Sequence, residues 1–244
     1  MAQEPLGEVI VSLDPAQLVD YAAIATLRFR TFDRFDLPEY DLVGLSRSQG
    51  ETYPDLIRRL RRLDRALAER GARRTWVIDA TGVGRAVLDM ARAAGIPAVG
   101  IVITGAEDYS YDSVQDVYRA GKLGLITAAD AAVQSRRMRI AKGIPLLPVL
   151  IEELRELRAT LTAAGRVQVA VPDTNADQHD DLVMALAQGC WAASVLWTPA
   201  AVRWWKTIAL SSDPGDFREV GDIKPGDPTG EDMAEAFRVS ESAS

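Results

Sequence analysis

The chain has 244 residues, of which 26% are charged and 48% are hydrophobic, and its formal net charge is −7. This composition is typical of a globular protein with one sizeable core, and no run approaches the ~18 apolar residues of a membrane span. His179 and Cys190 are the only histidine and cysteine, which excludes an internal disulfide or a zinc site of these residue types and favours a reducing compartment. No secretory signal is expected, because residues 1–5 have no basic segment leading into an apolar one.

The charge is unevenly distributed along the chain. Residues 211–244 contain nine acids and three bases, so this segment carries −6 and residues 1–210 carry −1. We therefore predict a folded domain over 1–210 and an acidic, disordered tail over 211–244, because the tail has little apolar surface to bury. The nearly neutral body does not exclude a nucleic-acid partner.

The first half of the chain predicts strands followed by a helix. Three strands are expected, at 9–14, 21–29 and 41–46, and their short connections favour antiparallel hairpins. A helix is predicted over 53–70, where leucines recur at three- and four-residue steps and arginines occupy the other face.

A strand–helix–strand unit comes next. Residues 75–79 form an apolar strand, a turn at 80–84 leads into a helix that ends near residue 94, and residues 98–103 form another strand. The short loops of this unit predict a parallel, right-handed crossover.

The remaining body is predicted to be mostly helical. Helices are expected at 113–120, 128–136, 148–161, 179–193 and 199–210, and short strands at 138–141 and 167–171. The order of all these elements predicts one α/β domain. Its mixed central sheet has three antiparallel strands first and parallel strands later, and helices flank it.

Aspartates stand where apolar segments begin or end. Asp14 closes the first strand and Asp79 the strand at 75–79, so parallel pairing of these strands would bring both to one carboxyl edge. Asp180 and Asp181 begin a helix, and Asp20 precedes the second strand. Gathered carboxylates repel one another, and two divalent cations such as Mg²⁺ would relieve that repulsion and support phosphodiester cleavage.

Each aspartate also has an ordinary structural interpretation. Asp14 before Pro15 is a common turn pair, and Asp79 is suited to cap the turn that follows it. Asp180 and Asp181 fit the first turn of any helix, where acids are favoured. The spacing of the acids alone leaves these alternatives open.

Three stretches together resemble the nuclease domain of the large terminase subunit of tailed bacteriophages. They are Asp14–Ala16 with Asp20–Ile24, Val77–Gly84, and His179–Ala187. The resemblance extends over about residues 7–195 and includes 138–157. It implies a ribonuclease H-like fold and a divalent-metal-dependent endodeoxyribonuclease that cuts concatemeric viral DNA during genome packaging.

The resemblance also implies roles for particular residues. Asp14, Asp79 and Asp181 would be catalytic, and the metal ligands would be Asp14, Asp79, Asp180, Asp181 and Asp20, with Asp181 favoured within the adjacent pair. Two divalent cations, Mg²⁺ or Mn²⁺, are the expected cofactors. The expected partners are double-stranded DNA, a packaging ATPase and a portal, with no membrane, in the cytoplasm of an infected or prophage-carrying bacterial host.

The chain departs from full-length terminase subunits in one respect. Gly121-Lys122 is followed by Leu123 and lacks the earlier glycine of a P-loop, so no packaging ATPase is expected in this sequence. The sequence fits an excised domain or a free-standing gene product, and DNA translocation by this chain alone is not expected.

Basic residues near the last motif are candidates for contacts with DNA phosphates. The candidate DNA-binding residues are Lys122, Arg137, Arg139, Lys142 and His179. The arginines between Arg58 and Arg74 are interpreted as a solvated helix face, because their helix follows the third strand, away from the expected metal edge. Alternatives to the terminase-type nuclease are a non-cleaving DNA-binding or docking module, a nucleotide-binding protein and a Holliday-junction-resolvase-like nuclease.

Overall fold

The computed structural model describes residues 7–16, 20–31, 37–106, 108–161, 167–170, 179–196 and 217–219. Its main sheet is formed by β1 (Glu8–Asp14), β2 (Tyr21–Thr31), β3 (Pro38–Gln49), β4 (Arg73–Asp79), β5 (Ala98–Thr104), β6 (Ser110–Asp112), β7 (Val117–Gly121), β8 (Met138–Ala141) and β11 (Phe217–Glu219). A separate pair is formed by β9 (Arg158–Leu161) and β10 (Val167–Ala170). The helices are α1 (Tyr53–Glu69), α2 (Gly84–Ala93), α3 (Lys122–Gln134), α4 (Leu147–Glu156) and α5 (Asp181–Leu196).

The main sheet is mixed, and its strand order is β11-β8-β3-β2-β1-β4-β5-β7-β6. Strands β1, β2 and β3 are antiparallel to their neighbours in this group. Parallel pairing joins β1 to β4, β4 to β5, β5 to β7, and β3 to β8. The edge strands β6 and β11 pair antiparallel with β7 and β8, respectively. The predicted mixed α/β sheet is therefore confirmed.

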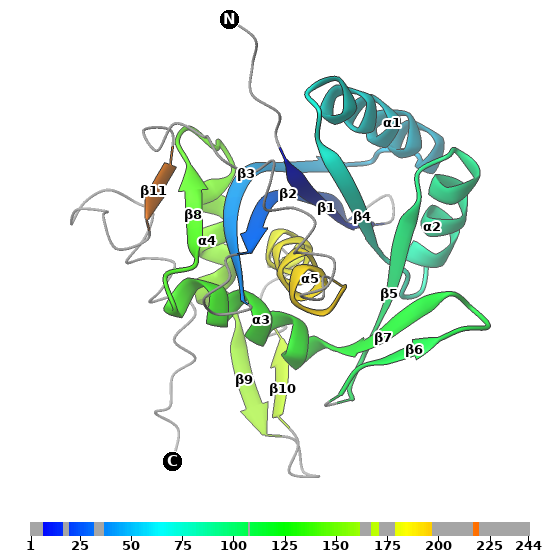
Figure 1. Ribbon diagram of the computed structural model, residues 1–244. Coiled ribbons are helices and arrows are strands. Elements are labelled where there is room, and N and C mark those ends of the chain that lie inside the picture. The colour runs from blue at the N-terminus through cyan, green and yellow to red at the C-terminus, as the bar shows by residue number, and fades with distance from the viewer. Residues whose placement is uncertain are drawn as a thin grey trace, which may run out of the picture.

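Alternating side chains of the strands build one core on each face of the sheet. Val9, Val11 and Leu13 of β1 pack with α1 and α2, whereas Ile10 belongs to the core formed with α3, α4 and α5. Figure 1 shows the sheet curving around α5, with α1 and α2 outside that curve. The apolar α5, buried from Leu182 to Ala193, thus lies against the centre of the sheet.

Four helix predictions were wrong in type or extent. Residues 113–120 form a turn and β7, because Oδ1 of Asp112 accepts bonds from the backbone N–H groups of Val114 and Gln115, both at 3.1 Å, and turns the chain. The helix expected at 148–161 ends at Glu156, where β9 soon follows, and the helix expected at 128–136 already begins at Lys122. The helix expected from residue 179 begins at Asp181 and continues to Leu196.

Parts of the predicted organisation lie outside the described residues. These are the helix expected at 199–210 and the acidic tail over 211–244, apart from β11, which pairs with β8. The domain boundary at residue 210 stays a prediction. Within the ranges that the structure describes, no helix is both long and apolar enough to cross a bilayer.

Gly84 at the start of α2 provides a direct test of how tightly this helix approaches β4. A Cβ atom at Gly84 would lie 1.9 Å from the backbone oxygen of Asp79 and 3.0 Å from Cγ of Pro15. We expect Gly84→Ala to lower the free energy of unfolding by about 1–3 kcal/mol, because the backbone must move to admit the methyl group. Urea unfolding measures this change.

The matched control is Gly105→Ala, since a Cβ at Gly105 meets nothing within 4 Å. This substitution should change the free energy of unfolding by less than about 0.5 kcal/mol. Equal stability of the two variants would contradict the close approach of α2 to Asp79.

Candidate active site

Asp14 and Asp79 end neighbouring parallel strands. Leu13 lies opposite Ile78 in the register of β1 and β4, so the next residue of each strand is one of these aspartates. Leu13 and Ile78 face α1 and α2, whereas the Ser12 hydroxyl on the other face donates to the Ala185 carbonyl of α5 at 2.5 Å. By alternation, both aspartates project on the α5 side of the carboxyl edge.

The surroundings of Asp14 destabilise its negatively charged form. Burial raises the pKa of Asp14 well above its usual value, and the charges of Asp79, Asp181 and Asp180 raise it further, while Lys122 lowers it. Burial also raises the pKa of Asp79, which is 8% exposed, against hydrogen bonds from Thr81, whose backbone N–H donates at 2.7 Å. The fold thus brings four acidic side chains near one another.

The adjacent acids Asp180 and Asp181 have different partners. Oδ2 of Asp181 accepts a bond from Nη2 of Arg47 at 2.7 Å, whereas Oδ2 of Asp180 is 2.6 Å from Nζ of Lys122. Burial raises the pKa of Asp181 while Arg47 lowers it. Arg47 is opposite Ala23 in the β2–β3 register, and Ala23 is opposite Asp14, so the same strand level carries Asp14 and Arg47.

Glu153 and Arg47 were not predicted from the sequence. Oε2 of Glu153 accepts bonds from the backbone N–H groups of Leu182 at 2.8 Å and Val183 at 3.1 Å, which otherwise lack partners at the start of a helix. Its Oε1 lies 3.5 Å from Nη1 of Arg47, whose guanidinium carbon is 3.8 Å from the centre of the Tyr21 ring. Burial raises the pKa of Glu153 to about 8, against these donors and the charge of Arg47.

A sequence signal for Glu153 exists in hindsight. Glu153 is 4% exposed and precedes Leu154 on the apolar face of α4, where a charged residue requires a partner. No comparable signal marks Arg47, because its partners come from segments far away in the chain. Their convergence is a property of the folded sheet.

Asp20 and His179 lie beside this group. Asp20 is exposed at the entrance to β2 and is not among the charges that act on Asp14, so its predicted metal-binding role stays a prediction. The His179 ring packs edge-on against Tyr21, with centroids 5.1 Å apart, and its proximity lowers the pKa of Asp181. The structure thus places His179 at the carboxylate edge.

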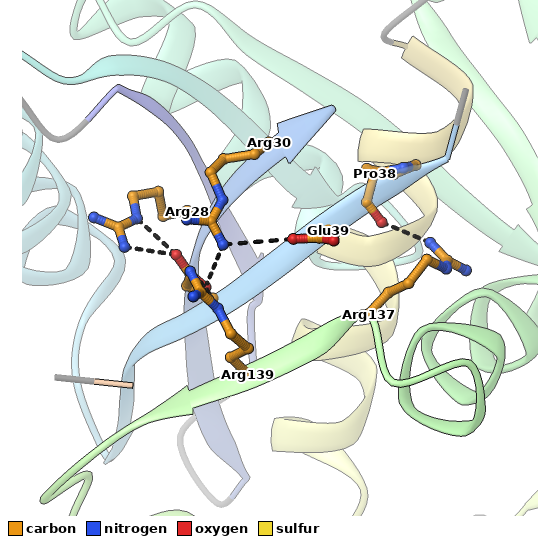
Figure 2. A network of polar contacts seen from close by, with 7 residues as sticks. Arg28, Arg30, Pro38, Glu39, Arg137 and Arg139 are labelled. Carbon is orange, nitrogen blue, oxygen red and sulfur yellow. Dashed lines mark hydrogen bonds and ion pairs between the residues drawn. The ribbon is translucent and has the colours of Figure 1, made fainter. Parts of the chain in front are cut away.

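Two candidate DNA-binding residues, Arg137 and Arg139, lie near the other end of the sheet. Arg139 pairs with Asp41, which is 1% exposed and also pairs with Arg28 and Arg30. Figure 2 shows these arginines converging across β2, β3 and β8. Arg137 donates to the Pro38 carbonyl at 2.6 Å.

Lys142 is exposed just after β8. Of the predicted DNA-binding residues, the structure therefore brings Lys122 and His179 to the carboxylates. The roles of Arg137, Arg139 and Lys142 in DNA binding stay predictions.

Helix α1 begins closer to the carboxylate edge than its place in the sequence suggested. Gln49 at the end of β3 is opposite Tyr21, and Arg59 in the second turn of α1 donates to the Ser46 and Ser48 hydroxyls at 3.2 and 2.8 Å. The expectation that this helix lies away from the edge was therefore wrong for its first turns. The reason is that β3 is antiparallel to β2 and therefore ends at the carboxylate edge, where α1 begins soon afterwards.

The acidic group has the right donors for a hard divalent cation but is held partly by cations of the chain itself. In the described part of the chain, no three acidic, histidine or cysteine side chains are already arranged to hold a metal ion. Lys122 and Arg47 supply two positive charges against the four aspartates and Glu153. The remaining excess of carboxylate oxygens fits Mg²⁺ or Mn²⁺ by charge and donor type.

The bonds from Glu153 to the start of α5 provide a test of what holds Asp181 in place. Glu153→Ala should lower the free energy of unfolding by about 1–3 kcal/mol, because two buried N–H groups lose their acceptor. The control is Glu152→Ala, since the Glu152 side chain is 65% exposed and pairs with Arg155, and such pairs contribute less than about 1 kcal/mol. Urea unfolding that gave equal losses for both variants would contradict this role.

Comparisons with known proteins agree with this architecture. The family model described as the terminase RNaseH-like domain matches residues 11–190. The crystal structure of the large terminase nuclease from thermophilic phage G20c matches with a TM-score of 0.50 and 22% identity, over 74% of this chain and 80% of that chain. A second crystal structure of that nuclease, with bound zinc, gives a TM-score of 0.44 and 20% identity, over 74% and 78%.

No curated protein matches the chain. The match to the G20c nuclease at a TM-score of 0.50 concerns the fold. The family model extends from within β1 into α5 and includes all four carboxylates of the edge. The resemblance expected from the sequence is therefore confirmed, and the chain belongs to the terminase RNaseH-like domain family.

Proposed function

We propose that this chain is a divalent-metal-dependent endodeoxyribonuclease of the phage terminase type. It would cleave phosphodiester bonds of concatemeric viral DNA during genome packaging. The observation that carries the proposal is the convergence of Asp14, Asp79, Asp180 and Asp181 at one sheet edge, in a chain of the terminase RNaseH-like domain family. A cluster of like charges is costly unless cations compensate it.

Two cations, Mg²⁺ or Mn²⁺, are the proposed cofactors. Asp14, Asp79 and Asp181 would hold them, with Asp180 and Asp20 as further ligands. When bound, such ions lower the pKa of a water and stabilise the charge that develops on the leaving oxygen of a phosphodiester.

The chain's own backbone and side chains hold the carboxylates in place. The Thr81 N–H fixes Oδ1 of Asp79, and Arg47, clamped between Tyr21 and Glu153, fixes Oδ2 of Asp181. The substrate phosphate would approach beyond the carboxyl ends of β1 and β4. Contacts there would be made to the DNA backbone, so we expect little base-sequence preference.

Double-stranded DNA is the proposed substrate, and a packaging ATPase and a portal are the proposed partners. The host cytoplasm is the proposed place of action. DNA binding without cleavage would instead favour a docking module, and preferential cutting of four-way junctions would favour a resolvase-like nuclease.

Plasmid cleavage tests the proposed activity. The wild-type chain should cut supercoiled plasmid with Mn²⁺ and not with EDTA. Asp79→Asn should lower the rate by more than about 100-fold, because even residues that only support metal ligands contribute up to about that factor. The control Asp89→Asn alters an exposed residue of α2 that pairs with Arg85, and it should cut like the wild type. No cleavage by the wild type, or equal cleavage by Asp79→Asn, would overturn the proposal.

The raised pKa of Asp14 predicts proton release on metal binding. Because burial and neighbouring acids favour the protonated carboxyl, a cation that binds the Asp14 carboxylate competes with a proton for it. Affinity for Mn²⁺ should therefore rise with pH and fall as acid restores the proton. Titration calorimetry in two buffers of different ionisation enthalpy measures the released protons. A binding enthalpy that is the same in both buffers, with affinity independent of pH, would contradict this coupling.

A further inference from the structure

Lys122 brings a positive charge to the carboxylate edge from a third strand. It directly follows β7, which runs parallel to β5, and β5 runs parallel to β4. Its Nζ is 2.6 Å from Oδ2 of Asp180, and its charge also acts on Asp14 and Asp79. One ammonium therefore interacts with three of the four aspartates.

The local structure of α3 does not favour a cation at this position. Lys122 is the first residue of the helix, where the macrodipole is positive and acids are preferred. The first turn of α3 has no acidic residue, and its N-cap Gly121 provides no side-chain hydrogen bond. The attraction that holds the ammonium here must therefore come from the carboxylates across the edge.

The two residues that form ion pairs with the aspartates of the edge, Arg47 and Lys122, differ in how firmly they are held. The planar guanidinium of Arg47 lies on Tyr21, bonds Asp181 and approaches Glu153, and its side chain is 13% exposed. The Lys122 ammonium ends a flexible four-carbon chain that is 31% exposed and makes its ion pair with Asp180. Moving the Lys122 ammonium away from Asp180 therefore requires less rearrangement than moving the Arg47 guanidinium away from Asp181.

We propose that Lys122 is a built-in counter-ion that competes with a divalent cation for Asp180. This inference rests on the proposed function. A metal ion that uses Asp180 must displace the ammonium, whereas Asp181 stays fixed by Arg47. The adjacent acids therefore have different roles: Asp181 is a fixed carboxylate and Asp180 an exchangeable one. Lys122 is in this sense a positioning residue for the metal site.

The sign of the effect of removing Lys122 distinguishes this role from a purely structural one. Loss of a merely structural contact would loosen the edge and weaken metal binding. Loss of a competing ammonium should strengthen metal binding, because Asp180 no longer has to give up a partner. The expected gain is about three- to tenfold in affinity, the size of a partly exposed ion pair.

The test is calorimetric titration of the full chain with Mn²⁺ in the absence of DNA. Lys122→Met, which keeps much of the side-chain length, should bind Mn²⁺ about three- to tenfold more tightly than the wild type. Lys122→Arg keeps the charge and should bind like the wild type. The control Arg119→Met removes one positive charge from β7, where Arg119 pairs with Asp112, and should also bind like the wild type.

A double substitution locates the competition at Asp180. In an Asp180→Asn background, Lys122→Met should change the affinity for Mn²⁺ much less than it does in the wild type, because only the longer-range effect of Lys122 on Asp14 and Asp79 remains. If Lys122→Met or the polar variant Lys122→Gln, folded by circular dichroism, binds Mn²⁺ no more tightly than the wild type, the inference is overturned while the proposed function stands. If no protein binds Mn²⁺, the wild type included, the proposed function fails and this inference with it.

Discussion

Four like charges held close together at the end of a sheet are the constraint on which this structure depends. Their repulsion contributes to the raised pKa of Asp14, so the electrostatics of the edge alone would push it apart. The compensating free energy comes from apolar packing elsewhere. Helix α5, which begins with Asp181, is buried from Leu182 to Ala193 and brings almost no charge into the core. Core packing thus fixes where the acids meet.

The close approach of α5 to the sheet makes this positioning strict. A Cβ atom at Gly189 would lie 2.6 Å from Cδ1 of Leu27 and 2.9 Å from Oγ of Ser12. The absence of a side chain at Gly189 therefore allows the helix to pack directly against β1 and β2. The Ser12 hydroxyl also bonds the Ala185 carbonyl. A slip of α5 by one turn would move Asp181 by about 5.4 Å and separate it from both Arg47 and Asp14. The position of Asp181 relative to the other carboxylates therefore depends directly on how α5 packs against the sheet.

The sequence predicts the local parts of this arrangement well and its long-range parts poorly. The apolar runs that end in Asp14 and Asp79 identify two strands. Their parallel pairing, on which the shared edge depends, was only a condition at the level of the sequence, and the folded sheet supplies it. The hairpin at residues 110–121 was missed because it depends on the short-range turn bonds of Asp112, which compete with helical propensity. Arg47 was missed because its partners lie in distant segments, and the acidic residue at Glu153 on the apolar face of α4 did not by itself identify its partners.

The two ends of the sheet differ in charge balance, and this difference indicates which end suits a cation. Near the start of β3, the buried carboxylate of Asp41 meets three arginines, so the negative charge there is more than compensated by the chain itself (Figure 2). At the carboxyl edge the acids are in excess, because the ion pairs there come from Arg47 and Lys122 and face four aspartates and Glu153. A buried carboxylate without a full set of cations is unfavourable unless protons or metal ions complete it. A buried aspartate therefore forms structural ion pairs at one end of β3, whereas the aspartates at the other end require positive charge from outside the chain.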